Sequence, residues 1–90
     1  MKRVLINIIG EVQGVYFRKF TQQKARELGI MGYVRNRDDM SVEVLAQGAD
    51  VAVNQLIAWC YHGAPSAVVK DVVIEEDLDN DIYLDFDISP

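Results

Sequence analysis

The chain has 90 residues, of which 50% are apolar and 26% are charged, and its net charge at pH 7 is −5. This length accommodates one hydrophobic core rather than two, and the apolar content excludes an intrinsically disordered chain. The acidic balance argues against a general nucleic-acid-binding protein, which needs a basic face. We therefore expect residues 1–90 to form a single folded domain that binds no nucleic acid.

The basic residues are concentrated in the first part of the chain. Eight of the nine Lys and Arg lie at or before Arg37, and the ninth is Lys70. From Asp71 onward the sequence contains eight Asp and Glu and no basic residue. If the chain binds an anion, the first forty residues are therefore expected to bind it, while the acidic end is interpreted as a solvated surface.

No segment is apolar over the ~20 residues that a membrane-spanning helix requires. The charged start Met1–Arg3 leads into an apolar run, but this run ends near Ile9 without a small-residue cleavage site, so a strand is expected rather than a signal peptide. The single cysteine, Cys60, has no internal disulfide partner, as is usual in a reducing compartment. These features predict a cytoplasmic protein without a membrane attachment.

The first predicted elements are a strand, a loop and a helix. Val4–Ile9 is apolar and rich in β-branched residues, as in a buried strand, and Gly10 ends it. Glu11–Val15 is expected to form a loop. Phe17–Leu28 has apolar or small residues at helical spacing and is followed by Gly29, a typical helix terminator.

A hairpin and a second helix come next. Tyr33–Arg37 and Ser41–Gln47 have the composition of strands and are joined by the polar turn Asp38–Met40. Asp50 is a suitable N-cap for a helix that ends near Gly63. The apolar face of that helix consists of Val53, Leu56, Ile57 and Cys60.

Two further strands complete the predicted fold. Ala67–Ile74 is the fourth strand, and residues 82–89 alternate with a period of two. The face of this fifth strand that we expect to be buried consists of Ile82, Leu84, Phe86 and Ile88. The order β-α-β-β-α-β with an appended strand buries its apolar surfaces most simply when both helices pack on one face of an antiparallel sheet. We therefore predict an α+β, ferredoxin-like sandwich with a short fifth C-terminal strand.

The junction between the first strand and the first helix is the main candidate for a binding site. Backbone N–H groups converge at such a junction with the helix dipole behind them, and Gly10 and Gly14 allow tight turns and close approach to a ligand. Arg18 and Lys19 in the first helical turn oppose the dipole by roughly 0.3–1 kcal/mol each unless an anion is bound. The alternative is an ordinary turn with Arg18 in water, because short glycine motifs often occur by chance.

Asn36 lies near the end of a predicted strand, although Asn is uncommon in strands. Its side chain either starts the turn toward Ser41 by bonding the backbone or takes part in a site. In a site, its carbonyl oxygen could hold a water molecule and its NH₂ group a phosphate oxygen, without titrating. Taken alone, the residues around Asn36 favour the turn over the site.

Several motifs together resemble the acylphosphatase family. They are Gly10–Arg18, with the sequence GEVQGVYFR, and Gly32–Asn36, with the sequence GYVRN. The similarity continues through Ser41–Val44, Ala46–Gly48 and Gly63–Val69, so it covers nearly the whole chain in order. The run VQGV followed by FR is far more specific than a lone glycine loop.

The resemblance implies a ferredoxin-like fold and the hydrolysis of acyl phosphates to a carboxylate and inorganic phosphate. Carried over to matching positions, Arg18 would grip the phosphoryl group and Asn36 would orient the attacking water. The phosphate-binding backbone N–H groups would be those of Glu11, Val12, Gln13, Gly14, Val15, Tyr16 and Phe17. No metal and no cofactor are expected, and a monomer would bind a small acyl phosphate and release inorganic phosphate.

Two residues depart from the family pattern. Glu11 places a carboxylate beside the proposed anion loop, and we expect its side chain to point into solvent. Met40 stands in a turn where the family usually has glycine. If this position needs a positive φ, either Met40 is strained or the hairpin after Asn36 uses another turn.

Two other functions remain open on the same fold. One is a catalytically weak module that only binds phosphate, which the presence of both Arg18 and Asn36 disfavours. The other is an interaction or RNA-binding domain, which the acidic balance and the lack of a basic, aromatic-rich strand face disfavour. The lone His62 and the aspartates of residues 77–81 lack the partners that a metal site needs.

Overall fold

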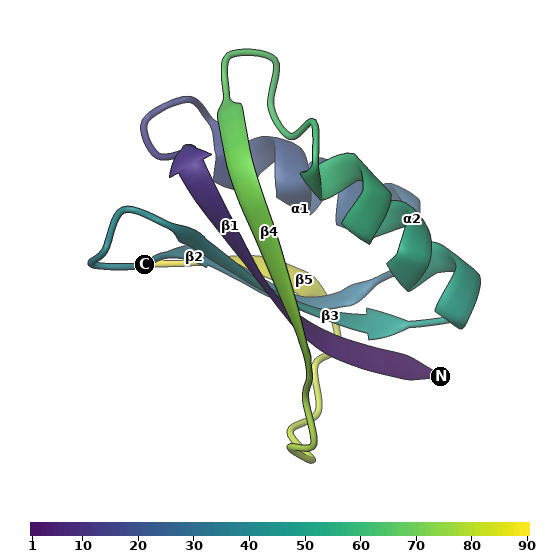
Figure 1. Cartoon of the computed structure of the whole chain (residues 1–90). Helices are drawn as coiled ribbons and strands as arrows, with labels where there is room; N and C mark the ends of the chain where they lie inside the picture. Colours follow the sequence, from purple (N-terminus) through teal and green to yellow (C-terminus); the bar gives the residue numbers. More distant parts are fainter.

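The computed structural model describes all 90 residues, and its helices and strands follow the predicted order (Figure 1). They are β1 (Lys2–Glu11), α1 (Phe17–Glu27), β2 (Met31–Asn36), β3 (Val42–Gly48), α2 (Asp50–Cys60), β4 (Val68–Glu76) and β5 (Phe86–Ser89). The predicted α+β sandwich is confirmed, because both helices cover one face of a five-stranded sheet. Neither helix is long and apolar enough to cross a membrane.

The sheet has the strand order β4-β1-β3-β2-β5. β1 pairs antiparallel with both of its neighbours, so Val4 faces Ala46 on one side and Glu76 on the other. β2 pairs antiparallel with β3, but β5 joins β2 in parallel. Residues 77–85, here called the crossing segment, carry the chain from one edge of the sheet to the other before β5 begins. The sheet is therefore antiparallel only through its first four strands.

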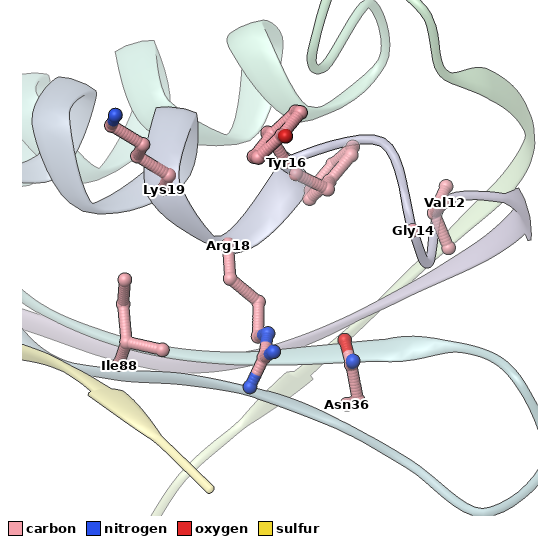
Figure 2. A pocket seen from close by; sticks show the side chains of 8 residues that line it. Val12, Gly14, Tyr16, Arg18, Lys19, Asn36 and Ile88 are labelled. Atoms are coloured by element: carbon pink, nitrogen blue, oxygen red, sulfur yellow. The ribbon is translucent and has the colours of Figure 1, made fainter.

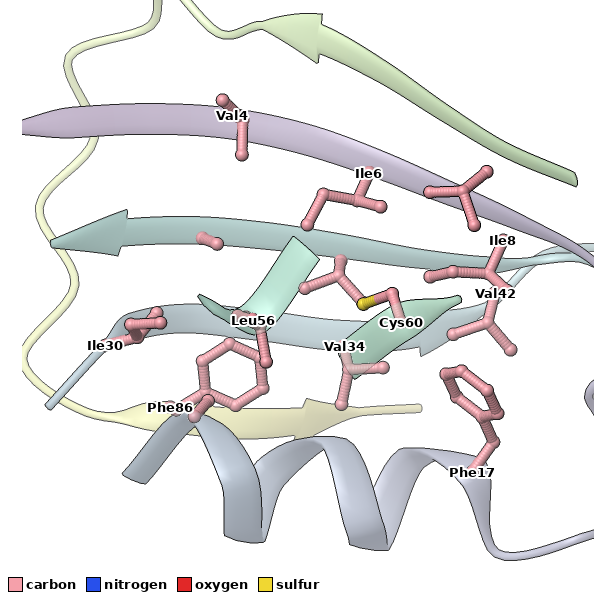
Figure 3. Packing of buried hydrophobic residues seen from close by; sticks show 14 of the residues in the cluster. Val4, Ile6, Ile8, Phe17, Ile30, Val34, Val42, Leu56, Cys60 and Phe86 are labelled. Carbon is pink, nitrogen blue, oxygen red and sulfur yellow. The ribbon is translucent and has the colours of Figure 1, made fainter. Parts of the chain in front are cut away.

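The hydrophobic core lies between the helices and the inner face of the sheet (Figure 3). It contains 17 buried residues, and Phe17 and Phe86 have the largest of the fully enclosed side chains. Burying a side chain of this size contributes about 1.5–3 kcal/mol. Val12 and Phe17 are exposed by only 1% and 2%, so the core fixes both ends of the loop between β1 and α1.

The fifth strand is shorter than predicted. Ile82 and Leu84, which we expected in the core, are 83% and 85% exposed, Ile88 is 38% exposed, and only Phe86 is fully buried. The crossing segment belongs to no strand and passes over the sheet face that carries no helix. No helix covers the segment from outside, so Ile82 and Leu84 face solvent. The prediction was wrong here because a period of two does not reveal where strand pairing begins.

The start of α2 also differs from the prediction. Asp50 is the first helical residue rather than the N-cap, which is Ala49, and no side chain caps the helix. Asp50 still favours the helix, because a negative charge in the first turn interacts well with the dipole. Its carboxylate also lies 3.7 Å from the N-terminal ammonium group of Met1.

Of the two alternatives for the turn between β2 and β3, the structure shows the strained Met40. The φ angle of Met40 is 74°, a value that costs a non-glycine residue about 1–2 kcal/mol. Backbone hydrogen bonds from Arg37 N to Ser41 O (2.9 Å) and from Met40 N to Arg37 O (3.1 Å) close the turn. The Asp39 carboxylate accepts a further bond from Ser41 N at 3.0 Å.

Candidate active site

A cleft opens where the start of α1 and the loop before it face the ends of β2 and β5 (Figure 2). Its volume is about 390 Å³. The residues that line it are Val12, Gly14, Tyr16, Phe17, Arg18, Lys19, Asn36 and Ile88. The fold therefore brings Asn36, at the end of β2, to the same space as Arg18 and the β1–α1 loop.

The loop of residues 12–16 presents free backbone donors. None of its N–H groups donates to another backbone group. Gly14 and Tyr16 have φ angles of 75° and 60°, and Tyr16, the residue before α1, makes no side-chain bond that would cap the helix. Donors that are left free at a helix N-terminus attract an anion, because the helix dipole adds to their partial positive charge.

Arg18 brings a positive charge that no carboxylate neutralises. The first turn of α1 contains no acidic residue, and neither Arg18 nor Lys19 takes part in any of the ion pairs of the protein. Arg18 Nη1 donates to the carbonyl oxygen of Ser89 at 3.2 Å. The guanidinium reaches from α1 toward Asn36, whereas Lys19 points away (Figure 2). Arg18 therefore has N–H groups available for a ligand.

Asn36 is the last residue of β2 and pairs with Val42 of β3. Its side chain lies beside the Arg18 guanidinium on the floor of the cleft (Figure 2). The side-chain bonds that close the following turn come from Asp39 and Gln13 rather than from Asn36. The amide of Asn36 is therefore placed at the cleft and is not used to start the turn.

The other basic residues of the hairpin lie on the opposite face of the sheet. Side chains alternate along a strand, so Arg35 and Arg37 point away from the face that Asn36 occupies. Both pair with Glu43, at 2.7 Å and 3.6 Å. Burial pushes the pKa of the Glu43 carboxyl upward, but hydrogen bonds from Arg35 and Tyr33 outweigh it and leave this pKa below its ordinary value. Burial and the bond to Glu43 raise the pKa of Tyr33 to about 12.

The rest of the proposed phosphate loop lies beside the cleft rather than in its lining. Glu11 is exposed to solvent, as expected, and lines a separate groove together with Gln13. Gly10 has a different purpose from the one predicted. A Cβ at Gly10 would collide with the carbonyl oxygen of Val68, so this glycine permits the close pairing of β1 with β4 and does not line the cleft.

Two features of the site were missed from the sequence. Ile88 lines the cleft, but its place there depends on where β5 joins β2. The left-handed conformation of Tyr16 was also not predicted, because a tyrosine rarely adopts a positive φ and its neighbours give no local signal for one.

The side chains that most often bind metals form no cluster. No three His, Cys, Asp or Glu residues are arranged to hold an ion. Cys60 is buried in the core, and this burial raises the pKa of its thiol to about 12. The cysteine is therefore a packing residue rather than a nucleophile.

The chain is thus a small α+β protein with helices on one face of its sheet. Its cleft contains free N–H groups and an unpaired arginine, which together attract an anion. The family model for acylphosphatase matches residues 4–88. An acylphosphatase of Shewanella oneidensis is 59% identical over 88 residues, which cover 98% of each chain. One of Shewanella amazonensis is 54% identical over 89 residues, which cover 99% of this chain and 98% of the relative. The crystal structure of acylphosphatase from Bacillus subtilis matches with a TM-score of 0.95 at 34% identity and covers 100% of both chains.

The chain therefore belongs to the acylphosphatase family. It is an enzyme that hydrolyses acyl phosphates to a carboxylate and inorganic phosphate, as the resemblance in its sequence implied. This result favours catalysis over a module that only binds phosphate.

Proposed function

We propose that the reaction takes place in the cleft between α1 and β2. In this mechanism Arg18 and the backbone N–H groups of Glu11–Phe17 hold the phosphoryl oxygens, and Asn36 orients the attacking water. The observation that carries the proposal is that Arg18 and Asn36, from different elements, line the same cleft. The free N–H groups of the loop add the donors that a phosphate requires.

The role of Arg18 follows from its charge and its shape. A guanidinium presents a planar fork of donors that matches two phosphoryl oxygens, and such charge-assisted bonds are about twice as strong as neutral ones. Because no carboxylate competes for Arg18, a bound phosphate would be its only anionic partner. The carbonyl oxygen of Ser89 holds one end of the guanidinium in place.

The chemistry then depends on position and charge. The oxygen of the water attacks phosphorus, the bond between phosphorus and the acyl oxygen breaks, and the carboxylate leaves with that electron pair. The proton of the water passes to an oxygen of the transferred phosphate, so the products are a carboxylate and inorganic phosphate. A carboxylate is a good leaving group and needs no strong general acid. Alignment of the water by Asn36 and stabilisation of charge by Arg18 supply the catalysis.

We also propose that the enzyme works without a metal or cofactor, as a cytoplasmic monomer of one domain that binds no nucleic acid. A single core of 17 buried residues supports the one-domain assignment. The free, buried Cys60 suits a compartment where disulfides are not needed. The net charge of −5 disfavours nucleic acid as a partner.

The test is the hydrolysis of an aromatic acyl phosphate by the purified protein in the presence of a chelator, beside Asn36→Ala. We expect turnover that resists the chelator and falls about 100-fold or more in the variant, because the water loses the group that orients it. The variant should still be inhibited by inorganic phosphate, since Arg18 and the loop are unchanged.

Asn54→Ala is the matched control, because Asn54 lies on α2, where it accepts a hydrogen bond from Lys2, and does not line the cleft. Its turnover should equal that of the parent. Full turnover by Asn36→Ala would remove the proposed role of Asn36, and loss of activity with chelator would contradict the metal-free mechanism.

A further inference from the structure

We infer that Gln13 is a positioning residue that sets Asn36 against the phosphate by tying the β1–α1 loop to the β2–β3 turn. The inference rests on the proposed role of Asn36 in orienting water. Gln13 Nε2 donates to the carbonyl oxygens of Arg37 at 2.8 Å and Ser41 at 2.9 Å. One amide group thus uses both of its protons on the turn that begins directly after Asn36.

The two acceptors of Gln13 are the carbonyl groups at the two ends of the turn. The Arg37 carbonyl already accepts from Met40 N, and the Ser41 carbonyl already accepts from Arg37 N. Gln13 adds a second bond to each of them from outside the hairpin. Because Arg37 follows Asn36 in the chain, holding the Arg37 carbonyl also fixes where the backbone of Asn36 lies relative to the loop.

The loop and the turn differ in how firmly they are otherwise held. The loop is anchored at its ends by Val12 and Phe17, which are buried in the core and do not depend on the side chain of Gln13. The tip of the turn, residues 38–40, is exposed, and Met40 is strained. Removal of the Gln13 amide should therefore displace the turn and Asn36 more than the loop.

This asymmetry predicts an effect on turnover that is separate from phosphate binding. Without the amide, the N–H groups of the loop and Arg18 still hold phosphate, but Asn36 orients the water less well. A misplacement of about 1 Å costs up to about 100-fold in rate, so partial misplacement should lower kcat by about tenfold. The inhibition constant for inorganic phosphate should change by less than about twofold.

The experiment is a double-mutant cycle between Gln13 and Asn36. Met has nearly the length of Gln but no N–H group, so kcat, KM and the inhibition constant for inorganic phosphate are measured for the parent, Gln13→Met, Asn36→Ala and the double variant. We expect Gln13→Met to lower kcat about tenfold in the parent background. In the Asn36→Ala background it should lower kcat by less than about twofold, because the residue through which it acts is gone.

Gln22→Met is the matched control. Gln22 Nε2 donates to the carbonyl oxygen of Phe86 at 3.0 Å, so this variant loses the same kind of bond away from the turn. It should lower the melting temperature without lowering kcat more than about twofold.

Three results would overturn the inference while Asn36→Ala remains inactive. They are parental kcat in Gln13→Met, an equal loss in both backgrounds, or an inhibition constant that rises as much as kcat falls. Full turnover by Asn36→Ala would instead refute the proposed function, whatever Gln13→Met does, so the two failures are distinguishable.

Discussion

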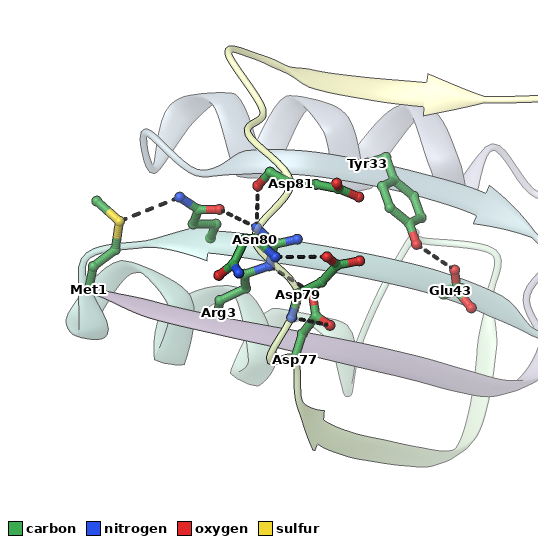
Figure 4. Close-up of polar contacts among 9 residues, drawn as sticks. Met1, Arg3, Tyr33, Glu43, Asp77, Asp79, Asn80 and Asp81 are labelled. Carbon is green, nitrogen blue, oxygen red and sulfur yellow. Dashed lines mark hydrogen bonds and ion pairs between the residues drawn. The ribbon is translucent and has the colours of Figure 1, made fainter.

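The β1–α1 loop and the crossing segment are both irregular and both leave backbone N–H groups without a backbone partner, but their cations are placed in opposite ways. In the loop, the N–H groups of residues 12–16 donate to no backbone carbonyl, and the neighbouring Arg18 pairs with no carboxylate. The crossing segment is held by Arg3, whose Nε lies 2.7 Å from Asp77 Oδ2 (Figure 4). Arg3 also donates to the carbonyl oxygen of Asp81, and its guanidinium carbon lies 5.5 Å from the centre of the Tyr83 ring.

The crossing segment uses its cation within the fold, since Arg3 binds Asp77 and the carbonyl oxygen of Asp81. The loop leaves Arg18 free of any carboxylate, so its guanidinium is available to a ligand. The pairing of the cation, rather than the number of free donors, therefore distinguishes the functional loop from the structural one.

The largest effect is expected when the cation of the loop is removed. Arg18→Ala should lower kcat/KM by about 10²–10³-fold and weaken inhibition by inorganic phosphate, because the phosphoryl oxygens lose their charged donor. Steady-state kinetics with and without phosphate check both effects.

Arg26→Ala is the control for this change. Arg26 lies on the same helix but pairs with Asp85 at 2.9 Å, away from the cleft. Its removal should leave inhibition by phosphate unchanged. If phosphate inhibited Arg18→Ala as strongly as the parent, Arg18 would not be the anion anchor.

A smaller effect, on stability alone, is expected when the crossing segment loses its cation. Arg3→Ala removes the bonds to Asp77, Gln47 and Asp81, and because part of this network contacts water the loss should be about 1 kcal/mol. Urea unfolding measures the loss, and turnover should be unchanged.

The effect of Arg3→Ala should also depend on pH. The hydrogen bond from Arg3 holds the pKa of the Asp77 carboxyl below its usual range. A carboxyl with a lowered folded-state pKa stabilises the fold above its unfolded pKa, about 3.9, and loses that contribution as the pH falls through the folded value. The gap in stability between parent and variant should therefore narrow below about pH 4. A gap that is equal at pH 7 and at low pH would mean that this ion pair does not stabilise the segment.

The smallest effect is expected at the strained turn beside the cleft. Met40→Gly should raise the free energy of unfolding by about 0.5–1 kcal/mol, because glycine adopts a φ of 74° without strain, although its unfolded chain is more flexible. Thermal unfolding measures this. Asp38→Gly, in the same turn but without a positive φ, should be destabilising. A Met40→Gly variant less stable than the parent would show that side-chain contacts of Met40 outweigh its backbone strain.

The sequence patterns predicted the helices and strands and their order because most of these elements bury one face, which leaves a periodic pattern of apolar residues. Val4, Ile6 and Ile8 of β1 are buried at alternate positions, and the helices begin and end within about three residues of the predicted limits. The chain lengths between these elements leave few ways to pack two helices on a sheet. The ferredoxin-like arrangement could therefore be predicted from local pattern alone.

What could not be predicted depends on contacts between distant residues. The apolar residues Ile82 and Leu84 alternate like those of a strand, but their exposure follows from the path of the crossing segment over the open face. The bonds of Gln13 join residues more than twenty positions apart and leave no signal in local spacing. The roles of Arg18 and Asn36 were inferred from family resemblance. These two residues come together only when β2 and α1 pack, which local sequence patterns do not show.

The position of β1 inside the sheet has a consequence for how the chain acquires its structure. Both partners of β1 come later in the chain, and Val4 can pair with Glu76 only after 76 of the 90 residues have been synthesised. Closing such long loops costs entropy before the strand pairs form, so folding should be slow compared with that of a helical domain of the same length. During synthesis, the apolar strand β1 is made first and therefore stays longest without its second neighbour, β4.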